Sequence, residues 1–285
     1  MITVKAPSTY KPEREYIVRV IMGEFLGLEY QISFGNHANT TLSCDSGDEL
    51  ILPDTLFQIP PEDWLTDKSL PQRPLYVFDA KSNKTDCRLV DQYVPIIYGT
   101  NPQKSDPANY LPIDIFGSAF FMLSRYEELV KRDMDDHSRF PAAASLAYQE
   151  GFIDRPIVNE YTELLWFALK SKWNGLKRRR RSFRILPSHD VDKPFEYAFL
   201  STKELFKSCL TESARKRSAG FLKPVFNYLT HSKRLISDDP YNTFQWIMDI
   251  NEKNGLQSTF YFFGQKTHLD IDGQYDIQDP GARRW

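Results

Sequence analysis

Apolar residues recur at two different periods along the first 175 residues. Residues 2–6 alternate apolar and polar positions, which predicts a strand, and the helical spacing of apolar residues from Tyr16 to Leu26 predicts a helix that begins near Pro12 and ends at Gly27. Five further short strands are predicted at residues 29–34, 40–43, 49–52, 75–78 and 94–98. Two longer helices are predicted at 113–130 and 155–173, with a charged loop between them. We therefore expect an α+β domain over residues 1–175.

The later residues predict a strand, a helix and a second strand. An apolar run that begins at Arg184 ends in Asp190-Val191-Asp192 and stops at Pro194, as expected for a buried strand. A helix follows, capped by Asn242 or Thr243 and ended by Asn254-Gly255, and residues 258–263 read as a strand covered on both faces. This order implies two parallel strands in a second α/β domain over residues 183–285.

Five consecutive basic residues, 177–181, stand at the predicted domain boundary. Such a run is typical of a surface that contacts nucleic acid or a membrane, or of a solvated linker. We favour the linker because no aromatic residues interleave with the charges and the formal net charge of the chain is −2. The overall balance gives no reason to expect nucleic acid as a partner.

Composition indicates a globular protein. The chain has 285 residues, of which 41% are hydrophobic, and no window approaches 18 uncharged apolar residues, so we expect no membrane span. The N-terminus lacks the pattern of a signal peptide. Three widely spaced cysteines fit neither a disulfide framework nor a zinc knuckle, and they favour a reducing, cytoplasmic location.

The candidate chemistry lies at the end of the strand that begins at Arg184. Because a strand alternates its side chains, Asp190 and Asp192 are expected on one side, about 6.6 Å apart at roughly 3.3 Å per residue. Ligands of α/β sheets bind at the carboxyl ends of the strands. Two carboxylates on one side repel each other, and a divalent cation relieves that repulsion.

The pairing of Ser188-His189-Asp190-Val191-Asp192 with Ser258-Thr259-Phe260-Tyr261-Phe262-Phe263 resembles the polysaccharide deacetylase family, also called the NodB-homology domain or carbohydrate esterase family 4. The segments 116–128 and 155–161 resemble an uncharacterised bacterial α+β domain that precedes it. The resemblance implies an incomplete (β/α)-barrel-like domain after the N-terminal one. It also implies a metal-dependent hydrolase that removes N-acetyl groups from a carbohydrate.

By this resemblance, Asp190 is the catalytic base and Asp192 is a ligand of zinc or a similar divalent ion. His189 and Lys193 would then orient a carboxylate or contact the substrate, while the simpler interpretation of His189 is a hydrogen-bonded histidine at a strand end. The implied partner is a carbohydrate. Exposed strand edges also make a homo-oligomer an expectation.

The pattern of that family departs from this sequence in one respect. Its second motif is His-x-x-x-His, whereas the five histidines here include no two that lie four apart, so we expect a truncated domain with weak or absent zinc binding and no activity of its own. His137 and His268 are interpreted as loop residues. Whether the chain is an enzyme stays open, with two alternatives: a non-catalytic carbohydrate-binding or scaffold protein, and a sugar transferase whose metal is held by Asp190-Val191-Asp192.

Overall fold

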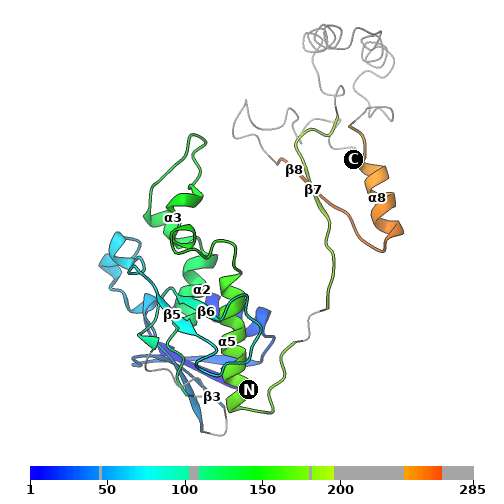
Figure 1. Ribbon diagram of the computed structural model, residues 1–285. Coiled ribbons are helices and arrows are strands. Elements are labelled where there is room, and N and C mark those ends of the chain that lie inside the picture. Colours follow the sequence, from blue (N-terminus) through cyan, green and yellow to red (C-terminus); the bar gives the residue numbers. More distant parts are fainter. Residues whose placement is uncertain (45–46, 103–108, 180–181, 196–240, 265–285) are drawn as a thin grey trace, which may run out of the picture. The chain divides into compact units, whose positions relative to one another are not determined.

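The computed structural model describes residues 1–44, 47–102, 109–179, 182–195 and 241–264. The chain divides into two compact units, Met1–Arg181 and Ser182–Trp285 (Figure 1). The elements are a mixture of helices and small sheets, which confirms the mixed α and β composition that the sequence predicts.

The first unit is built on a four-stranded sheet. Its strands lie in the order β2, β1, β3 and β4, which cover Tyr30–Gly35, Ile2–Pro7, Thr40–Ser43 and Glu49–Leu52. The outer strand β2 runs parallel to β1, because helix α1 (Lys11–Val18) and the π-helix η1 (Arg19–Phe25) carry the chain back across the sheet. The strands β3 and β4 pair antiparallel.

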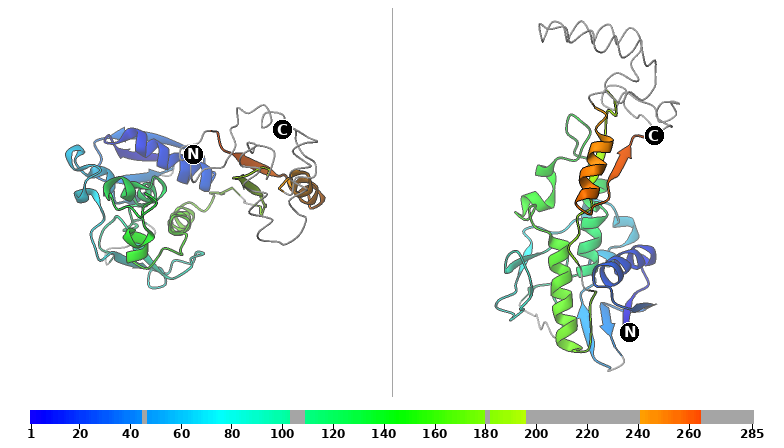
Figure 2. Two further views of the ribbon diagram at one scale, coloured as in Figure 1. Left: turned by 90° about the horizontal axis from the view of Figure 1, so that it is seen from above. Right: turned by 90° about the vertical axis from the view of Figure 1, so that its right-hand side faces the viewer.

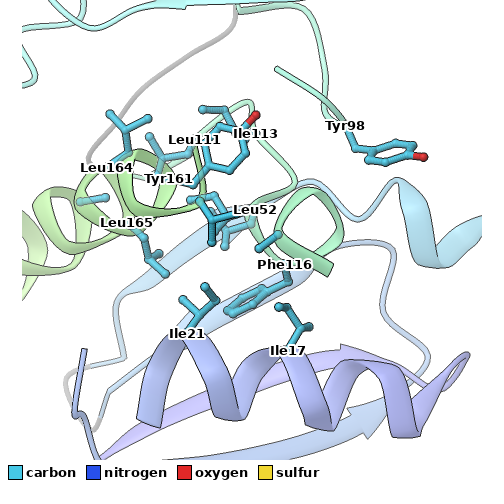
Figure 3. Close-up of a cluster of buried hydrophobic side chains, with 14 of the residues drawn as sticks. Ile17, Ile21, Leu52, Tyr98, Leu111, Ile113, Phe116, Tyr161, Leu164 and Leu165 are labelled. Atoms are coloured by element: carbon cyan, nitrogen blue, oxygen red, sulfur yellow. The ribbon is translucent and has the colours of Figure 1, made fainter. Parts of the chain in front are cut away.

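One face of this sheet forms the core. Val4, Leu42 and Leu50 stand opposite one another in neighbouring strands and are fully buried, whereas the Lys5–Glu49 ion pair is partly exposed. Helices α1, α2 (Ile115–Leu123) and α5 (Ile157–Lys172) pack over the buried residues, and α2 lies beside α5 (Figure 2). Side chains from α1, α2, β4 and α5 meet in the cluster of Figure 3.

Shorter elements complete the first unit. A second sheet consists of β5 (Tyr76–Asp79) and β6 (Tyr93–Ile96), paired antiparallel. The short helices are α3 (Tyr126–Val130), α4 (Leu146–Gln149) and the 3-10 turns Leu56–Gln58, Pro61–Asp63, Asp67–Ser69 and Ala142–Ala144. The strands predicted in this part of the chain are therefore confirmed to within a few residues.

The prediction of one helix over 113–130 is wrong. The helix ends at Leu123, Arg125 adopts the left-handed conformation with φ of 56°, and α3 starts at Tyr126. The carbonyl of Phe120 accepts from both the amide and the hydroxyl of Ser124, and the left-handed conformation of Arg125 then interrupts the helix. Apolar spacing alone does not reveal such a break because the stripe continues across it.

A buried polar junction ties α1, α2 and the end of β4 together. The guanidinium of Arg14 donates to both oxygens of Asp54, at 2.6 and 2.7 Å, and lies 4.7 Å from the centre of the Phe57 ring. Asp114 caps α2 by accepting from the amide of Gly117, and it also accepts from the amides of Thr55 and Leu56. The junction thus fixes the segment after β4 against two helices.

The second unit contains β7 (Ser188–Val191), α8 (Phe244–Lys253) and β8 (Thr259–Phe262). The two strands pair in parallel, as the strand, helix, strand order predicts, with Asp190 opposite Tyr261. Phe244 is buried and lies 5.1 Å from the Phe260 ring and 5.9 Å from the Phe262 ring. Thr243 precedes α8, and Gly255, with φ of 69°, follows its end.

Two expectations for this unit fail within the described residues. Ile185 and Leu186 lie before the strand, which begins at Ser188, and both are exposed. Strand β8 is not covered on both faces, since Tyr261 is 59% exposed. The described strands β7 and β8 form a two-stranded sheet, and nothing among the described residues confirms the expected incomplete barrel.

Several predicted features lie outside the described residues. They are most of the insertion between Phe195 and Ser237, the residues after Gly264, and the side chains of Cys209, His231 and His268.

The Arg14–Asp54 pair should be critical for stability. Replacing Asp54→Asn leaves a buried guanidinium without its counter-charge, and breaking a buried ion pair on one side costs about 3–5 kcal/mol of the free energy of unfolding. Urea denaturation of the full chain, followed by tryptophan fluorescence, measures this loss. The matched control Glu49→Gln breaks the exposed Lys5–Glu49 pair and should change stability by less than about 1 kcal/mol. Equal losses in the two variants would contradict the prediction.

The contribution of Asp114 to the stability of the first unit should fall as pH rises through the acidic range. Burial is the main cause that raises the pKa of Asp114 from 3.8 to about 7, and the negative charge of Asp54 is the second. Hydrogen bonds from three backbone amides lower the pKa but do not outweigh these two causes. The folded state therefore holds the proton more tightly than the unfolded state. The resulting stabilisation is complete below 3.8 and is lost as pH rises toward about 7.

Urea denaturation of the wild type and of Asp114→Asn at a series of pH values checks this linkage. The stability of the wild type should decline relative to that of the variant as pH rises across this interval. Parallel pH profiles for the two proteins would show that Asp114 does not take up the proton.

Candidate functional site

Asp190 and Asp192 flank the end of β7. Asp190 is the third residue of the strand, Val191 is its last, and Asp192 follows in a bend. Both aspartates are exposed, whereas Val191 between them is 8% exposed. Because the strand is parallel to β8, this is the carboxyl end of both strands, where polar side chains meet solvent.

His189 is held by packing within the second unit. Its ring stacks on that of Phe260 at 4.9 Å between centroids, and its Nε2 lies 3.4 Å from the side-chain nitrogen of Asn251. The same Asn251 nitrogen donates to the hydroxyl of Ser258 at 2.7 Å. These contacts join β7, β8 and the C-terminal turn of α8, so they explain His189 without any ligand.

Lys193 contacts an aromatic ring. Its ammonium lies 5.1 Å from the centre of the Tyr241 ring, in a cation–π arrangement. The structure thus brings Lys193 to the residues that lead into α8.

The described residues do not complete a zinc site. They contain no group of three or more histidine, cysteine or carboxylate side chains positioned to hold a metal ion. Asp190 and Asp192 supply two carboxylates, whereas catalytic zinc sites have three protein ligands. The donor set found in this part of the chain therefore fits weak binding of a divalent ion and does not fit a resident zinc.

The acidic loop around His137 is organised by its own backbone. The Asp135 carboxylate accepts from the amides of Arg139 and His137, and the hydrogen bond from Arg139 is the main cause of the lowered pKa of Asp135. The carboxylate is thus engaged in closing a turn.

Sequence patterns missed the buried charged groups of the first unit. Arg14, Asp54, Asp114 and Glu160 are all less than 10% exposed, and each has charged or backbone partners. One signal was available in the sequence: an aspartate directly before an apolar helical run, as Asp114 is here, is a common N-cap residue. Its carboxylate then accepts from the amide three residues later, that of Gly117. Nothing in the sequence pairs Arg14 with Asp54, which are 40 residues apart.

Two general features can be read from the described residues. None of their helices combines the length and the apolar composition that crossing a bilayer requires.

Cys44 and Cys87 take part in no disulfide, and burial raises the pKa of the Cys87 thiol to about 11, which makes it a poor nucleophile at neutral pH.

Comparison with known proteins overturns the resemblance drawn from the two strand motifs. A family model described as "Family of unknown function (DUF7033)" matches residues 2–174. No polysaccharide deacetylase family is found, so that assignment is wrong. The aromatic run of β8 has a local explanation, since Phe260 and Phe262 pack on Phe244 as strand residues commonly do. No curated protein and no solved structure matches the chain.

Proposed function

Because the chain belongs to the DUF7033 family of unknown function, we propose its function from its own residues: Asp190 and Asp192 serve the hydrolysis of an N-acetyl group on a carbohydrate. Asp190 is the general base, and Asp192 is a ligand of a divalent ion. The roles of the two carboxylates are argued from the second unit alone, and the N-acetyl carbohydrate is the substrate class that the binding experiment below tests.

The observation that carries the proposal is the exposure of both carboxylates at the carboxyl end of β7, on either side of buried Val191. Two exposed carboxylates so close in sequence attract a cation and are open to a substrate. The role of Asp190 as general base does not require a metal ion, because its carboxylate accepts a proton from the water that attacks the amide carbonyl.

His189 and Lys193 have supporting roles in this proposal. His189 stacks on Phe260 and thereby fixes the direction of β7 just before Asp190. Lys193 follows Asp192 in the sequence, and its ammonium lies over the ring of Tyr241. In this proposal both residues orient the site, and neither is required to touch the reacting atoms.

A cytoplasmic location completes the proposal. Cys44 and Cys87 form no disulfide, which is consistent with a reducing compartment.

Zinc affinity should be weak and should depend on both aspartates. Calorimetric titration of the full chain with ZnCl2 should give reversible binding that is far from stoichiometric at micromolar protein, because two carboxylates leave the ion mostly hydrated. Asp190→Asn and Asp192→Asn should each reduce this binding. The control Asp249→Asn changes an exposed aspartate of α8 in the same unit and should leave it unchanged.

Two results would contradict this assignment. One is tight stoichiometric zinc binding, which requires a ligand set beyond these carboxylates. The other is equal loss of zinc binding in Asp192→Asn and Asp249→Asn, which would place the ion elsewhere on the protein.

Binding of an N-acetylglucosamine oligomer tests the substrate class. Saturation-transfer NMR with the full chain should detect the oligomer only when ZnCl2 is present, and Asp192→Asn should remove the signal. Binding that is equal with and without zinc, and unchanged in Asp192→Asn, would favour a non-catalytic carbohydrate-binding protein. Any zinc-dependent release of acetate should disappear in Asp190→Asn and persist in Asp249→Asn.

A further inference from the structure

We propose that a cavity in the first unit binds a small molecule that carries an oxyanion, a phosphate or a carboxylate, on an apolar body. The cavity has a volume of about 710 Å³. Four segments line it: the end of η1 at Phe25 and Leu26, the loop 88–90, the first turns of α5 and the pair Arg178 and Arg179. This volume lies within the range of small-molecule sites, about 300–1,000 Å³.

The charges on the cavity wall leave two arginines without an acidic partner. Glu160 is 2% exposed and accepts from the guanidinium of Arg155 at 3.0 Å and from the amide of Val90 at 2.7 Å. Glu163 pairs with Arg178 at 2.6 Å. Both carboxylates of the wall are thus compensated.

Arg88 and Arg179 make no ion pair within the part of the chain that the structure describes, and both are exposed on the cavity wall. A guanidinium presents a planar set of donors that matches the oxygens of a phosphate or a carboxylate. The wall therefore carries two positive charges that an anionic ligand would neutralise.

Much of the remaining lining is apolar. Phe25, Leu89, Val90 and Pro156 contribute to it beside the polar residues Asn159 and Thr162, and Val90 is 64% exposed although it is hydrophobic. An apolar surface next to two arginines suits a ligand with an apolar body and a charged end better than a free inorganic ion. This is the reason to expect an organic oxyanion.

The wall that carries Arg179 is fixed by backbone contacts. The amide of Arg179 donates to the carbonyl of Leu26 at 2.9 Å. Gly27 has φ of 64°, and a Cβ atom there would lie 2.5 Å from the Cβ of Arg179, so only glycine allows this approach. The basic run that the sequence suggests as a solvated linker is, at Arg178 and Arg179, part of the folded unit.

A π-helix leads into the same wall. In η1 the hydrogen bonds span five residues, as in the bond of 3.0 Å from the amide of Leu26 to the carbonyl of Ile21. π-Helices are rare and often occur at functional sites, since the wider turn displaces side chains from their α-helical positions. Here the wide turn ends at Phe25 and Leu26, on the cavity wall.

Calorimetric titration of the full chain with phenyl phosphate and with benzoate tests the site and separates the two oxyanion sources. At least one should bind, and more tightly than inorganic phosphate, because the apolar body adds contact with the wall. Phenol, which lacks the charge, should not bind. Arg88→Ala and Arg179→Ala should each weaken binding by about tenfold, the effect expected for loss of a charge-assisted hydrogen bond.

The matched control is Arg132→Ala, an exposed arginine of the same unit outside the cavity lining, which should leave binding unchanged. Because all three arginines are exposed, their replacement should preserve the fold, and a thermal unfolding curve of each variant verifies this. Absence of saturable binding of phenyl phosphate and benzoate at millimolar concentration would overturn the proposal. Equal weakening by Arg132→Ala would overturn it as well.

Discussion

The first unit depends on the burial of one charge, the guanidinium of Arg14, and on the partners that compensate it. Arg14 lies on α1, its partner Asp54 follows β4, and the amides of the two residues after Asp54 donate to Asp114, which caps α2. A guanidinium in the interior is costly unless it is paired and fully hydrogen-bonded. The two helices and the sheet must therefore meet in the observed register, and the apolar cluster between them is packed around this junction.

The same reasoning explains how much of the fold could be predicted from the sequence. Strands such as Ile2–Pro7 and helices such as α5 have regularly spaced apolar residues, so they can be predicted from the local sequence. The break at Arg125 and the π-helix η1 depend on single backbone conformations that apolar spacing does not encode. The pairing of Arg14 with Asp54 depends on tertiary contact between distant segments.

The candidate site shows a related limit. The sequence could predict the parallel pairing of β7 and β8, because it follows from the order strand, helix, strand. It could also predict that Asp190 and Asp192 lie near the end of β7, because the apolar run stops there. The family assignment drawn from these two short segments was wrong. Many unrelated α/β units have acidic residues at the end of an apolar strand, and many have an aromatic strand. These two features therefore say little about the family to which a chain belongs. Exposure of Ile185 and Leu186 could not be read from their hydrophobicity, because burial depends on what the rest of the unit provides.

The two proposed sites differ in their relation to the family. Residues 2–174 match the DUF7033 model and include three of the four segments that line the cavity, whereas Arg178 and Arg179 lie just beyond the match, and Asp190 and Asp192 lie farther along in the second unit. If the cavity binds an anion, Arg179 supplies part of that site from outside the matched residues, held there by Leu26 and Gly27 within them. A change at Gly27 would then act on binding through Arg179 without touching the ligand. The proposals for the cavity and for the strand end thus rest on different residues, and each can fail without the other.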